Sequence, residues 1–228
     1  MAEIHLRGVV AIDLDGTLLR DTTVSSLLGV RFGDPLEIAE LERAYSAGEI
    51  GNDVFAERSA RTLRGVRLDD VAGILRSACW LDGIRQAVVS LHESGLEVVL
   101  ASITWAFASR MVADHFGFDG ACGTEMGIAD GVLDGDVRRY CLPADKAAFA
   151  VDRCRRVGLG PNRLAALGDS QGDLPLFAAA GLSVAVNGSE PAVAAADVSV
   201  RTRDLRDAVP LILAYFSTLE LAERALPL

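Results

Sequence analysis

Four aspartates in two short segments could do chemistry together if the fold brought them to one place. Asp13 and Asp15 share the segment Asp13-Leu14-Asp15-Gly16-Thr17, and Asp169 and Asp173 share the segment Gly168-Asp169-Ser170-Gln171-Gly172-Asp173. Two carboxylates about 4 Å apart repel by about 4 kcal/mol at an effective dielectric of 20, so a cluster takes up protons or binds a cation. With no His or Cys in the pattern, the oxygen ligands favour Mg²⁺, which also binds phosphate oxygens.

Ser102 and Lys146 add the groups that would complete a phosphate site. A serine hydroxyl and a lysine ammonium can both donate hydrogen bonds to a phosphoryl group. Lys146 is the only lysine among 22 basic residues, which is either an accident of composition or a position that needs a compact ammonium. Phosphoryl transfer depends mainly on positioning and charge stabilisation, and an aspartate can act as the nucleophile through an aspartyl-phosphate.

The elements that must position these residues are short apolar strands separated by helices. We expect strands at residues 8–12, 96–101, 164–167, 183–186 and 198–200. We expect helices between and after them at residues 82–94, 106–116, 145–157, 174–180, 191–195 and 205–216. This alternation predicts an α/β fold with a doubly wound, Rossmann-like parallel sheet. Ligands of such sheets bind beyond the carboxyl ends of the strands, where Asp13, Ser102 and Asp169 stand.

Two other regions have a different pattern. Residues 20–80 show no strand pattern and three helical segments, at 35–47, 52–63 and 68–78, which predicts an all-helical insert after the first strand. Residues 121–139 carry two hairpin turn signals, Asp130-Gly131 and Asp134-Gly135. The Leu- and Ala-rich tail, residues 217–228, is also expected to be helical.

Composition narrows the class of protein. A chain of 228 residues with 50% hydrophobic and 24% charged residues fits one compact domain with an insert. The net charge of −10 argues against nucleic acid and anionic membranes as partners. The four dispersed cysteines predict reduced thiols, and the absence of a signal-peptide pattern or an 18-residue apolar run predicts a cytoplasmic protein without a membrane span.

Four features, namely residues 13–17, Ser102, Lys146 and residues 168–173, resemble the four motifs of the haloacid dehalogenase (HAD) superfamily of phosphatases. They occur in the same order, and the similarity covers residues 8–215. The resemblance implies that Asp13 is the nucleophile and that Asp15 protonates the leaving oxygen and then activates the hydrolytic water. It also implies a Mg²⁺ site formed by Asp13, the backbone carbonyl of Asp15 and Asp169, with Asp173 in support.

The resemblance extends to the phosphate site and to the insert. Ser102 and Lys146 would hold the transferring phosphoryl group, and Gly16 and Thr17 would shape the turn beside it. The helical insert is similar to that family's small C1 cap. We therefore expect a catalytic core formed by residues 1–20 and 80–228 and a cap formed by residues 21–79.

Within the superfamily the sequence looks most like the phosphoserine phosphatase group, with departures where substrate is bound. That group places a glutamate nine residues after the nucleophile, where this chain has Thr22. Its Ser-Gly-Gly motif is Ser102-Ile103-Thr104 here, and Arg61 is a candidate for its carboxylate-binding cap arginine. Thr22, Arg61 and Thr104 are therefore candidate substrate residues, and the resemblance implies retained chemistry with an altered specificity.

The expected activity is Mg²⁺-dependent hydrolysis of a small phosphorylated metabolite. A phosphotransferase or phosphosugar mutase would use the same aspartyl-phosphate and stays open, because acceptor choice depends on water access and cap closure. A signalling receiver domain fits less well, because the motif order differs and a receiver has no helical insert. A binding protein that kept only the fold is a further alternative. The sequence leaves the oligomeric state open.

Overall fold

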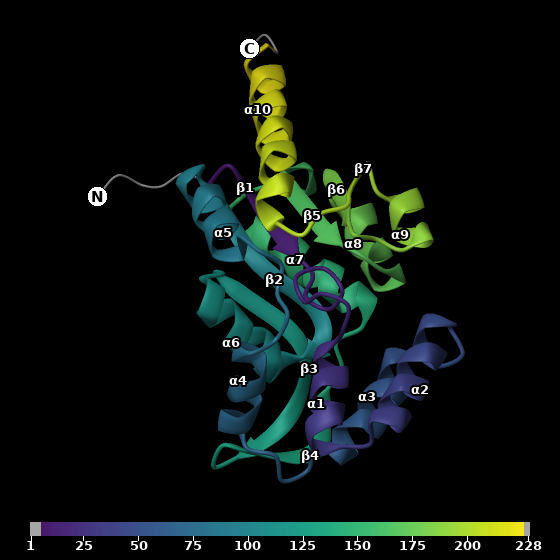
Figure 1. Cartoon of the computed structure of the whole chain (residues 1–228). Coiled ribbons are helices and arrows are strands. Elements are labelled where there is room, and N and C mark those ends of the chain that lie inside the picture. Colours follow the sequence, from purple (N-terminus) through teal and green to yellow (C-terminus); the bar gives the residue numbers. More distant parts are fainter. Residues whose placement is uncertain (1–5, 226–228) are drawn as a thin grey trace.

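A seven-stranded sheet organises the chain in the computed structural model, which describes residues 6–225 (Figure 1). The strand order is β4-β3-β2-β1-β5-β6-β7, and each neighbouring pair is parallel except β3 and β4. The strands are β1 (Gly8–Ile12), β2 (Leu96–Trp105), β3 (Gly120–Ala129), β4 (Val132–Arg139), β5 (Leu164–Gly168), β6 (Leu182–Val186) and β7 (Val198–Val200). The expected α/β class with a mostly parallel sheet is confirmed.

Helices cover both faces of this sheet. The helices that follow the insert are α5 (Ile84–Glu93), α6 (Ala106–Phe116), α7 (Pro143–Arg156), α8 (Leu174–Ala179), α9 (Glu190–Ala195) and α10 (Val209–Ala225). Alternate residues of the fully buried strand β1 enter two separate apolar clusters. Val10 and Ile12 pack in a cluster with residues of α5, α6 and α10, whereas Val9 and Ala11 pack with residues of α7, α8 and α9.

The insert holds four helices rather than the three that the sequence pattern predicted. They are α1 (Val24–Phe32), α2 (Pro35–Ser46), α3 (Asn52–Thr62) and α4 (Leu68–Arg76). The prediction missed α1 because its glycine, serines and valines are poor helix formers. Thr23 compensates as the N-cap, since its side chain accepts a hydrogen bond from the backbone N–H of Ser26. Helices α1, α2 and α3 pack together, while α4 packs against α6 (Figure 1).

The hairpin β3–β4 turns once, at Asp130-Gly131, so the second predicted turn is wrong. Asp134 and Gly135 lie within β4, where Gly135 has a φ of +76°. A Cβ at Gly135 would come within 2.8 Å of the Arg64 Cβ atom. The glycine therefore permits close contact between the strand and the segment that follows α3, and it does not mark a turn.

Strand β2 and the C-terminal helix are longer than predicted. Strand β2 continues past residue 101 to Trp105, with a break in its pairing to β3 between Ala101 and Trp105. A 3₁₀ turn, Leu205–Ala208, precedes α10, which runs on to Ala225, so most of the predicted tail helix is confirmed. Residues 226–228, like residues 1–5 of the predicted core, lie outside the described part. No helix within residues 6–225 is long and apolar enough to cross a membrane.

Phe216 fixes α10 to the sheet, and its removal tests that anchor. The ring is fully buried, and it lies where a Cβ on Gly8 of β1 would meet it at 2.2 Å. We expect Phe216→Ala to lower the free energy of unfolding by about 3–5 kcal/mol in urea titrations, because it opens a cavity. Leu221→Ala, at a side chain that is 67% exposed on the same helix, is the control and should change it by less than about 0.5 kcal/mol. Equal effects of the two variants would contradict the anchor.

Candidate functional site

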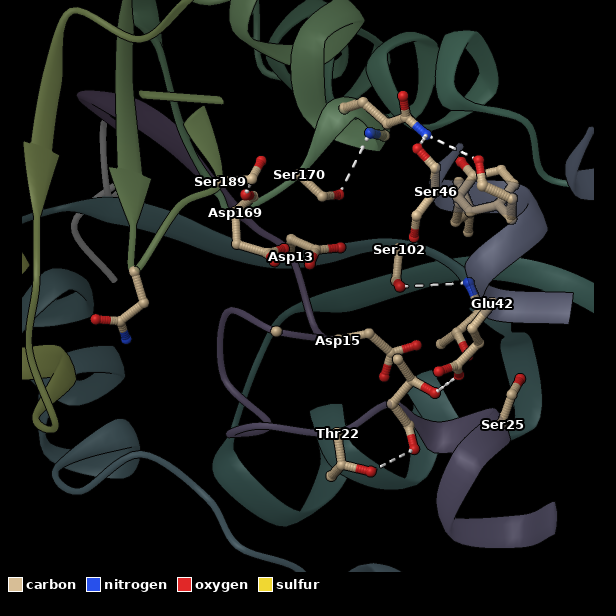
Figure 2. A pocket seen from close by; sticks show the side chains of 18 of the residues that line it. Asp13, Asp15, Thr22, Ser25, Glu42, Ser46, Ser102, Asp169, Ser170 and Ser189 are labelled. Carbon is tan, nitrogen blue, oxygen red and sulfur yellow. Dashed lines mark hydrogen bonds between the residues drawn. The ribbon is translucent and has the colours of Figure 1, made fainter. Parts of the chain in front are cut away.

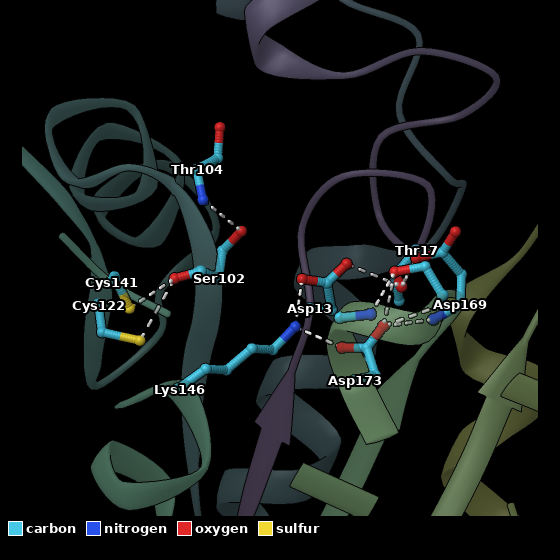
Figure 3. A network of polar contacts seen from close by, with 11 residues as sticks. Asp13, Thr17, Ser102, Thr104, Cys122, Cys141, Lys146, Asp169 and Asp173 are labelled. Carbon is cyan, nitrogen blue, oxygen red and sulfur yellow. Dashed lines mark hydrogen bonds and ion pairs between the residues drawn. The ribbon is translucent and has the colours of Figure 1, made fainter. Parts of the chain in front are cut away.

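Three neighbouring strands bring the predicted residues to one edge of the sheet (Figure 3). Asp13 follows β1, and its backbone N–H donates to the carbonyl oxygen of Leu167 in β5 at 2.9 Å. Asp169 follows β5, and Ser102 lies near the end of β2. Lys146 reaches the same edge from the first turns of α7. The short apolar strands thus place residues that are up to 156 positions apart around one point.

Lys146 is buried between two carboxylates. Its Nζ donates to Asp13 Oδ1 at 2.6 Å and also to Asp173 Oδ1, and the residue is 1% exposed. Burial alone would lower the pKa of Lys146, but the charges of Asp13 and Asp173 raise it well above its usual value. The ammonium therefore stays protonated and compensates part of the buried negative charge.

Asp173 holds the loop that carries Asp169. Its Oδ2 accepts the backbone N–H groups of Asp169 and Ser170, each at 3.0 Å, while its Oδ1 accepts Lys146. A Cβ on Gly168 would come within 2.2 Å of the Asp173 carboxylate carbon, so a glycine is needed there. With both oxygens engaged, Asp173 fits the predicted supporting role better than that of a direct metal ligand.

The carboxylates of Asp13, Asp169 and Asp173 lie close together, and those of Asp13 and Asp169 could hold a cation. One oxygen of each lies within 4.8 Å of the others. Thr17 Oγ1 lies between the first two, 3.2 Å from Asp13 Oδ2 and 3.4 Å from Asp169 Oδ1. Burial raises the pKa of Asp13 to about 6, and burial with the Asp13 and Asp173 charges raises that of Asp169 to about 8. This hard-oxygen donor set with excess negative charge fits Mg²⁺.

Asp15 has a different environment from Asp13, two residues away. Its Oδ1 accepts the backbone N–H of Val24, the first residue of α1, at 2.8 Å. Burial and the Asp13 charge raise the pKa of Asp15 to about 7, so it can donate or accept a proton near neutral pH. Gly16, which follows Asp15, has a φ of +81°, and a Cβ there would come within 2.3 Å of Asp169 Oδ2.

Two cysteine thiols contact the backbone carbonyl of Ser102 (Figure 3). The Sγ atoms of Cys122 and Cys141 lie 3.6 and 3.4 Å from the Ser102 carbonyl oxygen. The Ser102 hydroxyl is buried and accepts the backbone N–H of Thr104 at 3.3 Å. The two cysteines are far apart in the sequence, and only the folded hairpin brings their thiols together, so the sequence alone does not predict this contact.

A cavity of about 1150 Å³ opens over this edge, with walls from the sheet and from α1, α2 and α3 (Figure 2). The predicted substrate residues Thr22 and Thr104 line it. Arg61 does not line it, because it lies on the exposed side of α3, so the structure does not bring it together with the other two candidates. Lining residues that the sequence analysis missed include Glu42, Tyr45, Phe55, Arg201 and Arg203. None belongs to a local motif that could have identified it.

Comparisons with known proteins agree with this geometry. A family profile described as haloacid dehalogenase-like hydrolase matches residues 10–178. A phosphoserine phosphatase of Archaeoglobus fulgidus is 28% identical over 203 residues, which cover 87% of this chain and 58% of that protein. A phosphoserine phosphatase of Polaromonas sp. is 28% identical over 185 residues, which cover 78% of each chain. The chain thus spans little more than half the length of the Archaeoglobus relative.

Solved structures share the fold. A phosphoserine phosphatase with an analogue of the phospho-aspartyl intermediate superposes with a TM-score of 0.81 at 21% identity, covering 91% of this chain and 99% of that chain. A HAD family hydrolase from Salmonella enterica serovar Typhi gives a TM-score of 0.83 at 17% identity, covering 91% and 72% of the two chains. At these identities the likeness supports the fold alone.

The carboxylate group predicts a pH-dependent stabilisation by Mg²⁺. In the metal-free protein the raised pKa values of Asp13, about 6, and Asp169, about 8, favour protonated carboxyls, so stability falls as pH rises above 4 toward 8. Mg²⁺ competes with those protons. At a Mg²⁺ concentration 100 times the Kd at pH 8, we expect the fold to be stabilised by about 2.7 kcal/mol, or about 5–10 °C in thermal unfolding. The same Mg²⁺ concentration should give a smaller shift at pH 6.

Two variants control this measurement. Asp169→Asn removes a charged ligand and should abolish most of the Mg²⁺ shift, whereas Asp114→Asn, at an exposed residue of α6, should keep it. A shift that survives in Asp169→Asn, or that is larger at pH 6, would contradict the assigned site.

Proposed function

Because the chain belongs to the haloacid dehalogenase-like hydrolase family, we propose that it hydrolyses the phosphate monoester of a small molecule, with Asp13 as nucleophile and Mg²⁺ as cofactor. The observation that carries this proposal is the pair of aspartates on one turn. Asp13 is paired with Lys146, while Asp15 has a pKa raised to about 7. One carboxylate is thus suited to attack and the other to proton transfer.

In the first step, a carboxylate oxygen of Asp13 forms a bond to phosphorus while the bond from phosphorus to the leaving oxygen breaks. Asp15 gives its proton to that oxygen, so the alcohol leaves neutral. In the second step, the Asp15 carboxylate accepts a proton from a water molecule as the water oxygen attacks phosphorus. The Asp13–phosphorus bond breaks, Asp13 is restored as a carboxylate, and inorganic phosphate is released.

The groups around Asp13 would stabilise the negative charge of the phosphate. Mg²⁺, held by Asp13 and Asp169, would supply charge neutralisation for the phosphate oxygens. Lys146 holds Asp13 in place and presents its ammonium to the same region, and the buried Ser102 hydroxyl lines the cavity beside it. The fixed donors need little rearrangement during the reaction, which is what favours phosphoryl transfer.

We also propose that residues 21–79 act as a cap over the core formed by residues 1–20 and 80–228. Helices α1, α2 and α3 supply one wall of the cavity, so this segment would enclose a small substrate and exclude bulk water. We infer a cytoplasmic setting because all four cysteines are free, including the neighbouring Cys122 and Cys141, which suits a reducing compartment.

Replacement of the nucleophile is the first test. Asp13→Asn keeps the side-chain shape but removes the charge needed for attack, so phosphate release from 4-nitrophenyl phosphate should fall at least about 1000-fold. Thermal unfolding and circular dichroism should show a folded variant. Retained turnover would refute Asp13 as nucleophile. If the wild type transfers phosphate to another alcohol without releasing it, the activity is that of a phosphotransferase.

Lys146→Arg tests whether a compact ammonium is required. The larger guanidinium cannot take the buried position between Asp13 and Asp173 without moving one of them. We expect kcat to fall about 100-fold or more although the formal charge is unchanged. Arg155→Lys, at an exposed position on the same helix, is the matched control and should leave kcat within about twofold. A fully active Lys146→Arg variant would show that charge alone suffices.

A further inference from the structure

The position of Asp15 fixes where the leaving group must lie. Under the proposed function, on which this inference rests, the leaving oxygen has to approach the Asp15 carboxyl. That carboxyl is held by Val24 at the start of α1 and faces the cap side of the cavity, with Thr22, Ser25 and Glu42 around it (Figure 2). The atoms attached to the leaving oxygen therefore meet residues of α1 and α2.

Two consecutive hydrogen bonds connect Glu42 to the region around the Asp15 carboxyl. Its carboxylate accepts a hydrogen bond from the hydroxyl of Thr23, and the next residue, Val24, donates to Asp15. The Glu42 charge also contributes to the raised pKa of Asp15, behind burial and the Asp13 charge. Glu42 is half-buried, and Thr23 occupies one of its oxygens, which leaves the second available to a ligand.

The charged groups that the cap presents to the cavity are all acidic. Among the described residues 21–79, Asp21 and Glu42 line the cavity, and none of the arginines in this range does so. Arg43 and Arg58 instead pair with glutamates on the cap surface. An anionic group attached to the leaving oxygen would thus meet negative charge without a cap cation to offset it.

Aromatic rings complete the same wall. Tyr45 of α2 and Phe55 of α3 both line the cavity, with ring centroids 6.1 Å apart and planes tilted by 59°. Both are partly buried. Tyr45 lies three residues after Glu42 on α2, so the two side chains share one face of that helix. A carboxylate near aromatic faces attracts ammonium groups, through charge and through the negative faces of the rings.

The cavity also has a basic end, which lies at β6 and β7. Arg201 and Arg203 follow β7, and Thr202 between them exchanges two backbone hydrogen bonds with the Asn187 side chain after β6. Arg20 also lines the cavity, and its guanidinium contacts Cys79 Sγ. All three arginines come from the core, so the cap wall itself supplies no cation to the leaving group.

We propose that the substrate is the phosphate monoester of a small amino alcohol that carries no carboxylate. Its ammonium group binds the free oxygen of Glu42 and lies against Tyr45 and Phe55. This leaving group differs from that of phosphoserine by the carboxylate, for which the cap wall offers no cation.

Three short substrates of similar size provide the direct test. 2-Aminoethyl, 2-hydroxyethyl and carboxymethyl phosphate differ in the charge of the leaving group, and phosphoserine adds a carboxylate to the first. We expect kcat/KM for 2-aminoethyl phosphate to exceed that for 2-hydroxyethyl phosphate about tenfold, with carboxymethyl phosphate and phosphoserine lower still. Equal values for the three short esters, or a preference for either carboxylate, would overturn the inference.

A variant pair assigns the preference to Glu42. Glu42→Gln should reduce the ratio of kcat/KM between 2-aminoethyl and 2-hydroxyethyl phosphate about tenfold, whereas Glu40→Gln, exposed on the same helix, should keep the wild-type ratio. An unchanged ratio in Glu42→Gln would refute its role. If Glu42→Gln does not fold, the wild-type substrate series still decides the leaving-group class.

The same assays separate this inference from the proposed function. Hydrolysis of 4-nitrophenyl phosphate without a preference for the ammonium substrate would support the phosphatase activity and contradict the amino alcohol as leaving group. If none of these esters is hydrolysed in the presence of Mg²⁺, the proposed phosphatase activity itself is contradicted.

Discussion

The buried ammonium of Lys146 is the interaction on which the site depends. It compensates one of the charges that Asp13 and Asp173 bring into a region closed to solvent. With Asp169 added, three carboxylates face one ammonium, a formal charge of −3 + 1 = −2. A divalent cation cancels that excess, whereas protons can do so only by neutralising the groups that the chemistry needs. The charge balance of the site therefore favours a divalent cation.

Close backbone approaches make this crowding possible. Gly16 and Gly168 stand where any side chain would enter the space of Asp169 or Asp173. The first also takes a positive φ, which costs a glycine little. These two glycines flank the carboxylates in both acidic motifs, so the motifs encode backbone shape as well as charge. The strands β1 and β5 then need only to be parallel neighbours for the two motifs to meet.

The sequence predicted the residues at strand ends well and the residues of the cavity wall poorly. Asp13 and Asp169 follow apolar strands, so the topology of a parallel sheet suffices to bring them together. Glu42 and Tyr45 reach the cavity through the angle between helices, and that angle depends on long-range packing that no local pattern records. The position of Arg61 could not be predicted for the same reason, because a shift of one or two residues along a helix decides whether a side chain faces the cavity or the solvent.

One hydrogen bond links the proposed cap to Asp15, the proposed proton donor. The backbone N–H of Val24, at the beginning of α1, donates to Asp15 and favours its charged form, against the burial that favours the neutral form. Glu42 is connected to the same place, because it accepts a hydrogen bond from Thr23, the N-cap of α1. In the proposed reaction, recognition of the leaving group and delivery of its proton would thus be coupled through the consecutive residues Thr23 and Val24.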